Sequence, residues 1–295
     1  FTATGKKSAL LYAESGATID LSNSSQINLK ASGDESIGVY AKNGTIKLGT
    51  AGTGTGNYEI GKNGVLFYSD GTGAGRIETS GVNFTVGDGS LFTRITTPST
   101  TPGNEQIKFT HTTGHTNLNL LSGGIGFVYT GDGITPVTPV LINSYFSNNY
   151  SGLSNMDVTV NSGARLYVIE KYATMNLSSI GIISAPSTIF NNVTNNGGSK
   201  AFLLRGTLVL DPSSGIVDLD STTEDYNLIE KALTGITVNG GVTVSGSNAN
   251  QVALIDDNSY EGTLYVKMNN NGIINLSGAN SSGIYANRGQ VRNNG

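Results

Sequence analysis

The chain has 295 residues, a formal net charge of −4 at pH 7, 41 glycines and no cysteine. The lack of cysteine excludes disulfide bonds and thiolate metal sites, and the weakly acidic charge gives no electrostatic footprint for nucleic acid or an anionic membrane. Hydrophobic residues make up 37% and charged residues 13% of the chain, which allows a thin core in a sequence rich in glycine and small polar residues.

The chain begins at Phe1 without a signal peptide, and it ends at Gly295 inside a motif whose earlier copy continues into a strand. No run approaches the roughly 20 apolar residues that a membrane helix needs. We therefore interpret residues 1–295 as one continuous internal segment of a longer chain.

A motif of apolar residues around a tyrosine recurs along the chain. Its first three tyrosines are Tyr12, Tyr40 and Tyr68, which lie 28 residues apart, and each is followed by a glycine. These glycines, and the tyrosine and glycine of a last copy near the C-terminal end, are Gly16, Gly44, Gly71, Tyr285 and Gly289. Weaker copies occur at 127–129, 166–168, 202–204 and 252–254. We interpret the tyrosines as a stacked ladder and the glycines as turn residues, with a ligand-binding tyrosine stripe as the alternative.

A second segment with alternating apolar and polar residues follows the tyrosine motif, for example at 18–21, 45–48 and 273–276. This alternation is typical of a strand with one buried face. Because such short units cannot bury that face alone, a period of about 28 residues predicts stacked coils. We therefore expect an all-β, right-handed parallel β-helix with two or three strands per coil. The alternative, a sandwich of hairpins, does not account for the period.

The regular pattern fails between residues 82 and 152, where we expect irregular coils with inserted loops. Four of the six prolines lie there, and proline removes a donor from a strand ladder. Long insertions in a solenoid project from one face and often bind partners. The segment 143–152 carries three aromatic residues among amides, and it is our candidate platform for a sugar ring or a protein partner. Its proposed binding residues are Tyr145, Phe146, Asn148, Asn149 and Tyr150. The alternative is that these aromatic side chains pack back on the solenoid.

A short helix is predicted over residues 223–234, within an insertion that spans 222–235. Thr222 and Asp225 have capping-box spacing, Gly235 can end a helix, and apolar residues recur at helical intervals between them. Such a helix would cover an open strand edge, which makes its expected role structural.

Two histidines, His111 and His115, have the spacing of a zinc pair on a helix. Their segment is rich in threonine and glycine and is predicted as strand or loop, and the chain has no third histidine to complete a site. The Gly-Asp-Gly turns at 87–89 and 131–133 fall short of a calcium-binding repeat. We expect no metal and no cofactor.

Parallel β-helices include polysaccharide lyases and hydrolases, in which paired carboxylates are candidates for a catalytic site. The candidate acids are Asp218, Asp220, Asp256 and Asp257. The adjacent pair of aspartates follows the dipeptide Gly114-His115, which reverses the order found in pectin-cleaving hydrolases. We expect no enzyme activity, and a polysaccharide-cleaving enzyme remains the alternative function.

The repeats resemble those of the passenger domains of type V autotransporters, in particular the very large fusobacterial outer-membrane autotransporter adhesins. The resemblance rests on the segment 38–46, its copy at 283–291 and the sequence Asn-Leu-Ser-Gly at 275–278. It is clearest over residues 1–80 and 250–295.

This resemblance implies an extended β-helix on the surface of a Gram-negative bacterium, secreted through a C-terminal barrel that is its only contact with the membrane. It implies adhesion to other bacteria in a biofilm, or to host cells through a receptor or a glycan. The family has no shared catalytic site. A spacer stalk without a binding site of its own is the remaining alternative.

Overall fold

The structure is a computed structural model that describes residues 1–295 except 72–73, 131–135, 138, 171–173, 178–188, 213, 221–228, 232–234, 257–266 and 288. Nearly all regular structure in the described residues is β-strand, and the described strand pairs are parallel. The chain divides into two compact units, which are described separately. The first unit comprises 1–128, 140–167 and 186–200, and the second comprises 129–139, 168–185 and 201–295.

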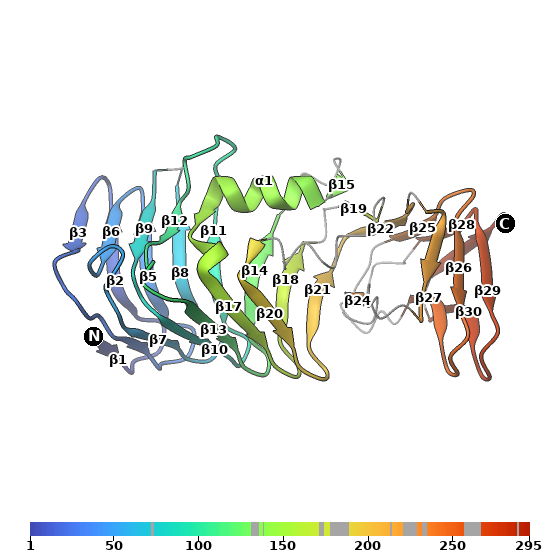
Figure 1. The fold of residues 1–295 in the computed structure, drawn as a ribbon, viewed down its shortest axis with the longest axis horizontal. Coiled ribbons are helices and arrows are strands. Elements are labelled where there is room, and N and C mark those ends of the chain that lie inside the picture. Colours follow the sequence, from blue (N-terminus) through green and yellow to red (C-terminus); the bar gives the residue numbers. More distant parts are fainter. Residues whose placement is uncertain are drawn as a thin grey trace. The chain divides into compact units, whose positions relative to one another are not determined.

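Three parallel sheets make up the first unit, and a coil contributes one strand to each (Figure 1). The first sheet has the order β1 (Thr2–Ala3), β4 (Leu29–Ala31), β7 (Asn57–Ile60), β10 (Asn83–Val86), β13 (Thr116–Leu120), β17 (Met156–Val160) and β20 (Asn192–Asn195). The second has β2 (Ala9–Glu14), β5 (Ile37–Lys42), β8 (Val65–Asp70), β11 (Leu91–Ile95), β14 (Ile125–Tyr129) and β18 (Arg165–Ile169). The third has β16 (Tyr150–Ser151), β12 (Ile107–Phe109), β9 (Arg76–Thr79), β6 (Thr45–Leu48) and β3 (Thr18–Leu21). This parallel β-solenoid confirms the fold that the repeat predicted.

The strand register places the repeated residues on one another. Tyr12 pairs with Tyr40, and Tyr40 pairs with Tyr68, along β2, β5 and β8. Along the outer face the rings of Tyr40 and Tyr68 stack with centroids 4.5 Å apart, and the ring of Tyr12 lies 5.0 Å from that of Tyr40, tilted by 33°. Residues on the other face of the same strands, such as Leu11 and Phe67, are buried. The tyrosine ladder predicted from the 28-residue spacing is therefore present in the first three coils.

The core of the first unit contains a cluster of phenylalanines from five different strands. They are Phe67, Phe84, Phe92, Phe109 and Phe127. Neighbouring ring centroids lie 5.2–6.0 Å apart, mostly in edge-to-face geometry. Because each such pair adds about 0.5–1.5 kcal/mol beyond the burial of its area, the cluster fixes the middle coils on one another.

Parallel strands also form the second unit. Its largest sheet has the order β15 (Pro136–Val137), β19 (Thr174–Leu177), β22 (Thr207–Leu210), β25 (Gly235–Val238), β28 (Lys267–Asn270) and β31 (Gln290–Asn293). Smaller groups are β23 (Ile216–Asp218), β26 (Thr243–Gly246) and β29 (Ile273–Leu276); β21 (Lys200–Leu204) and β24 (Ile229–Lys231); and β27 (Val252–Asp256) and β30 (Ser282–Ala286). Apolar residues again align on adjacent strands, as Leu208, Ile236 and Met268 do in the core.

The strands within 82–152 keep the solenoid register, and the extra residues lie in the connections. β10 and β13 pair residue for residue, and β11 pairs in parallel with β8. The connection from β11 to β12 spans 96–106, and the connection after β14 is long enough to hold a helix. The irregularity expected for this stretch is therefore confined to its connections.

Helix α1 (Pro139–Asn149) lies in the connection that precedes β16, and the short 3-10 helix η1 (Leu153–Asn155) follows β16. We expected an irregular segment here. The helix forms because proline suits a first helical position, and because Ile142 and Phe146 lie four residues apart on one buried face. This spacing is the sequence signal that could have identified it.

The structure describes only part of the helix predicted over 223–234, and it corrects that part. Its described residues, Ile229–Lys231, form β24, which pairs in parallel with β21. Gly235, expected to end the helix, begins β25. The rest of the predicted insertion, 222–235, lies outside the described residues. Pairing with an adjacent strand outweighs the local helical signal at Ile229–Lys231, since helix propensity is a weak preference that tertiary contacts override.

The glycines of the tyrosine motif meet two different requirements. Gly16 and Gly71 have φ angles of 83° and 107°, which favour glycine. Gly44 has no such angle, but a Cβ there would lie 2.8 Å from the carbonyl carbon of Ala13 and 2.9 Å from the carbonyl oxygen of Ala17. Glycine is therefore favoured at Gly16 and Gly71 by the turn conformation, and at Gly44 by the close packing of neighbouring coils.

We predict that Gly44→Ala lowers the free energy of unfolding by about 2 kcal/mol. The added methyl group overlaps the backbone of the preceding coil, which strand pairing holds in place. Gly16→Asn is the matched control. Asparagine accepts a positive φ, as Asn43 and Asn63 do in this chain, so this change should stay within about 0.5 kcal/mol. Urea unfolding followed by circular dichroism compares the two, and equal losses would contradict the packing argument.

Candidate functional site

Helix α1 carries four of the five predicted binding residues, and the fifth, Tyr150, begins β16. Phe146 and Tyr150 are each 3% exposed, and their rings stack with centroids 5.3 Å apart. Phe146 also meets Phe127 and Tyr167 near edge-to-face, with centroids 5.2 Å apart in both cases. These two predicted residues therefore present no open aromatic face to a partner, and the rings pack on the solenoid instead.

The amides of α1 hold the loop that follows β11. Asn149 is fully buried, and its Oδ1 accepts a hydrogen bond from the Ser99 backbone nitrogen over 2.7 Å. Asn148 donates its Nδ2 to the carbonyl oxygen of Thr100 over 3.3 Å. Tyr145 is partly exposed and donates its hydroxyl to a backbone carbonyl over 3.2 Å. The polar groups predicted to recognise a ligand thus bind the protein's own backbone.

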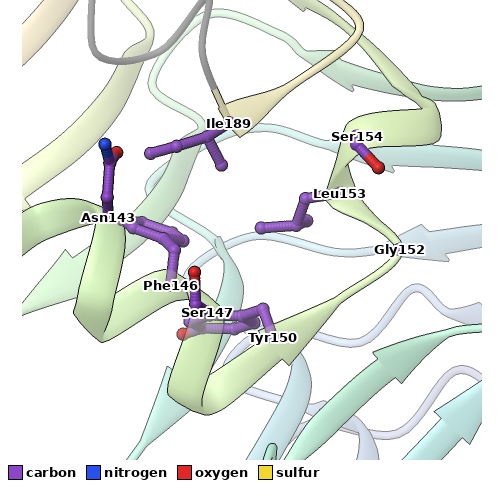
Figure 2. A pocket seen from close by; sticks show the side chains of 8 residues that line it. All are labelled: Asn143, Phe146, Ser147, Tyr150, Gly152, Leu153, Ser154 and Ile189. Carbon is purple, nitrogen blue, oxygen red and sulfur yellow. The ribbon is translucent and has the colours of Figure 1, made fainter. Parts of the chain in front are cut away.

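A small pocket of about 340 Å³ remains beside α1 (Figure 2). Its lining residues are Asn143, Phe146, Ser147, Tyr150, Gly152, Leu153, Ser154 and Ile189. In Figure 2, Leu153 and Ile189 extend from outside the helix toward Phe146 on α1 and Tyr150 on β16. The volume lies at the lower end of the range for ligand pockets. Two of the five predicted binding residues, Phe146 and Tyr150, contribute to this pocket.

We predict that Phe146→Ala lowers the free energy of unfolding by roughly 4 kcal/mol, because it removes a buried ring that is packed among other rings. Asn143→Ala on the exposed rim of the pocket is the control and should stay within about 0.5 kcal/mol. Denaturant unfolding of the two variants measures both effects. A stable Phe146→Ala protein would show instead that the ring is dispensable for folding and free to serve a ligand.

Two buried tyrosines ionise at unusually high pH. Burial raises the pKa of Tyr150 to about 12, although its hydroxyl shares a 3.0 Å hydrogen bond with Thr93 Oγ1. Burial likewise raises the pKa of Tyr58 to about 12, and its hydroxyl accepts a hydrogen bond from Thr79. An unfolded tyrosine has a pKa of about 10, so between about pH 10 and pH 12 the folded chain binds more protons than the unfolded chain.

We predict that these tyrosines contribute full stability below about pH 10 and that the stability falls as the pH rises toward about 12. The sign follows from the raised folded pKa, because unfolding then releases protons and high pH favours the unfolded chain. The double variant Tyr58→Phe, Tyr150→Phe should show a flatter decline in the free energy of unfolding. Urea unfolding at a series of pH values provides the test, and identical slopes for the two proteins would contradict it.

Rows of polar side chains lie on the outer face of the first sheet, from β7 to β17, and sequence reasoning missed them. Asn57, Asn83 and Asn117 occupy equivalent outward positions on β7, β10 and β13. Asn83 donates its Nδ2 to Asn57 Oδ1 over 2.8 Å, and Asn117 donates its Nδ2 to Asn83 Oδ1 over 3.1 Å. Asp157 occupies the same position on β17. Each amide therefore orients the next along the stack.

A second row lies two residues further along the same strands. Thr85, Asn119 and Thr159 are in register on β10, β13 and β17. Asn161, one residue beyond β17, donates its Nδ2 to Asn119 Oδ1 over 2.7 Å. Hydroxyl and amide groups thus alternate on this row, held by a sheet whose opposite face is buried in the core.

The two rows line a groove of about 560 Å³, which we call the amide groove. Its lining residues are Asn83, Phe84, Thr85, Asn117, Asn119, Leu121, Thr159 and Asn161. None of these side chains carries a charge or titrates near neutral pH. Leu121 is 42% exposed and adds an apolar contact to the polar rows. The amide groove therefore offers neutral donors and acceptors in fixed positions.

Charged side chains flank the amide groove without lining it. Glu59 on β7 lies 3.0 Å from the Lys30 ammonium group. On β17, one Asp157 oxygen lies 3.1 Å from His115 Nδ1, and the other accepts a hydrogen bond from Asn191 Nδ2 over 2.5 Å. Each carboxylate thus has a partner of its own beside the groove.

The two histidines do not form a pair. His111 is 6% exposed, and its Nδ1 lies 2.8 Å from the carbonyl oxygen of Gly54, whereas His115 is exposed beside Asp157. Among the described residues there is no group of three or more His, Cys, Asp or Glu that could hold a metal ion. The four-residue spacing of His111 and His115 therefore does not bring their rings to a common site.

The candidate acids of the second unit include one that stabilises a turn. Asp220 accepts hydrogen bonds from the backbone nitrogen and Oγ of Ser247 over 2.5 and 2.7 Å, and the side-chain bond chiefly lowers the pKa of this carboxyl. Asp218 accepts a hydrogen bond from the Asp220 backbone nitrogen over 2.9 Å. Asp257 and the side chain of Asp256 lie outside the described residues.

The tyrosine ladder bonds within its own face. Tyr12 and Tyr40 donate their hydroxyls to neighbouring carboxylates, and for Tyr40 the partner is Asp70 at 3.0 Å. The Arg94 guanidinium lies over the ring of Tyr68, 5.3 Å from its centroid. The hydroxyls of Tyr12 and Tyr40 and the ring face of Tyr68 therefore contact other residues of the solenoid.

The last copy of the motif has a different neighbour. Tyr285 on β30 pairs with Ile255 on β27 and is 49% exposed, so no tyrosine lies beside it on that strand. Gly289 lies in the connection between β30 and β31. The aromatic ladder of the N-terminal coils therefore does not recur at this pair of strands.

No family model, no curated protein and no solved structure matches this chain. Among the helices of the described residues, none is long and apolar enough to cross a membrane. The amide groove and the pocket beside α1 are the features of the described residues whose chemistry bears on function.

Proposed function

We propose that this chain is an adhesive segment of a bacterial surface protein of the autotransporter class. It binds a host-cell receptor, a glycan or the surface of another bacterium by non-catalytic contacts. The sequence resemblance supports the class, and the parallel solenoid is consistent with it. The observation that carries the binding role is the amide groove, a polar surface that extends over several stacked coils.

The groove chemistry favours binding over catalysis. A hydrolase or lyase needs a positioned acid or base, and proton transfer by such a group supplies much of its rate enhancement. The lining side chains of the amide groove are amides, hydroxyls and hydrocarbons. They donate and accept hydrogen bonds but hold no proton to transfer near neutral pH.

The groove is also pre-organised for recognition. Its amides are oriented by ladder hydrogen bonds, and its threonines stand on paired strands. Ordering flexible side chains costs about 0.5–1.5 kcal/mol each on binding. Side chains that are already ordered avoid most of this cost, so individually weak contacts can add up along the face.

We predict that the labelled chain binds bacterial or epithelial cells saturably, as measured by flow cytometry. Thr159→Arg should reduce this binding at least tenfold, because a long charged side chain fills the groove and each lost contact contributes about 1 kcal/mol. Thr237→Arg on β25, also an outward threonine within a strand, is the matched control and should bind like the original chain.

Circular dichroism and melting confirm that both variants are folded before binding is compared. Saturable binding that Thr159→Arg leaves unchanged would contradict the role of the amide groove. If the chain binds none of the cell types tested, the alternative of a spacer stalk without a binding site of its own is favoured.

A further inference from the structure

We propose that the amide groove binds an uncharged, linear glycan that lies across β10, β13 and β17. This inference rests on the proposed adhesive function and specifies the class of ligand for the same surface. It is carried by three observations on the described residues: unused hydrogen-bonding capacity, a neutral lining with negative flanks, and one apolar contact among the polar rows.

The ladder leaves Asn83, at the centre of the first row, with bonding capacity for a ligand. A primary amide has two N–H donors and two acceptor lone pairs. Asn83 uses one donor toward Asn57 and one lone pair toward Asn117. An adjacent donor and acceptor therefore remain on one rigid group. Sugar hydroxyls both donate and accept, so neighbouring hydroxyls of a ring can satisfy both sites at once.

The rows repeat along the direction in which the coils stack. Adjacent parallel strands lie about 4.8 Å apart, so equivalent groups on β10, β13 and β17 form a regular series of hydrogen-bonding sites. Thr85, Asn119 and Thr159 form such a series in register. A polymer with hydroxyls along its length can engage several of these sites together. A compact ligand in the same groove reaches fewer of them.

The groove lining offers no charge that would hold an acidic ligand. No lining residue is cationic, whereas Glu59 and Asp157 flank the groove. Recognition of sulfates, phosphates and uronates relies on arginine or lysine, which supply charge-assisted bonds. The cationic Lys30 lies against Glu59 at 3.0 Å. An uncharged ligand meets neither repulsion nor an unmatched positive charge here.

Leu121 supplies the apolar part of the site. Its side chain is 42% exposed beside the amides and hydroxyls that line the amide groove. A sugar ring has a C–H face as well as hydroxyl edges, and burying apolar area contributes about 25 cal/mol per Å². The combination of one exposed leucine with rows of neutral polar groups therefore matches an amphipathic sugar better than a charged polymer.

Isothermal titration calorimetry of the whole chain tests the inference. The probes are soluble oligosaccharides of cellulose and of chitin, which are uncharged, and of hyaluronan, which is acidic. We expect a neutral oligosaccharide to bind at least tenfold more tightly than the acidic one. Raising the salt from about 0.1 M to about 1 M shortens the Debye length from about 10 Å to about 3 Å and should leave the neutral affinity unchanged.

The double variant Thr85→Val, Thr159→Val removes two hydroxyls from the groove while keeping side-chain shape and strand preference. It should weaken neutral binding at least tenfold, since each hydrogen bond contributes about 1 kcal/mol. The control Thr237→Val, Thr243→Val changes two outward strand threonines of the second unit and should have no effect.

Tighter binding of the acidic probe, loss of affinity at high salt, or equal affinities of the two double variants would overturn the inference. If the chain adheres to cells but no neutral oligosaccharide binds, the glycan inference fails and the adhesive function stands. If neither cells nor oligosaccharides bind, both fail.

Discussion

In-register pairing of parallel strands is the constraint on which the rest of this structure depends. Each coil satisfies its backbone donors and acceptors with the next coil, so equivalent residues must lie directly over one another. Tyr12, Tyr40 and Tyr68 stack for this reason, and so do Ile19 and Ile46 inside the third sheet. A short strand with one apolar face is sufficient, because its neighbours complete the burial that it cannot achieve alone.

The same constraint organises the outer face. Side chains that alternate outward on β7, β10, β13 and β17 are brought into rows, where amides satisfy one another and hold a fixed orientation. A composition rich in asparagine, threonine and glycine with few charges is then suited to the fold, since like charges stacked at strand spacing would repel. The same strand pairing therefore stabilises the fold and arranges the polar groups that we propose for recognition.

Burial favours one of the two interpretations of the aromatic segment 143–152, namely that its rings pack back on the solenoid. Phe146 and Tyr150, two of the three aromatic residues proposed as a binding platform, fill the core beneath α1. Burial of a large aromatic ring is more favourable than burial of a smaller side chain. The aromatic residues of an insertion are therefore expected to pack that insertion on the rest of the protein. The polar groove drew no notice because single asparagines and threonines are common in turns and loops, and nothing local distinguishes those that stand in rows.

The sequence by itself determined the parallel solenoid, because a regular period and strand alternation leave few other ways to bury one face of every unit. It also indicated the tyrosine ladder, since the first coils have equal length. Only the tertiary structure decided that α1 replaces a loop, that Ile229–Lys231 is a strand, and which polar residues become neighbours. Asn57 and Asn83 are 26 residues apart, and Asn83 and Asn117 are 34 apart. Insertions of different length shift the period between coils, so only the backbone register aligns these amides.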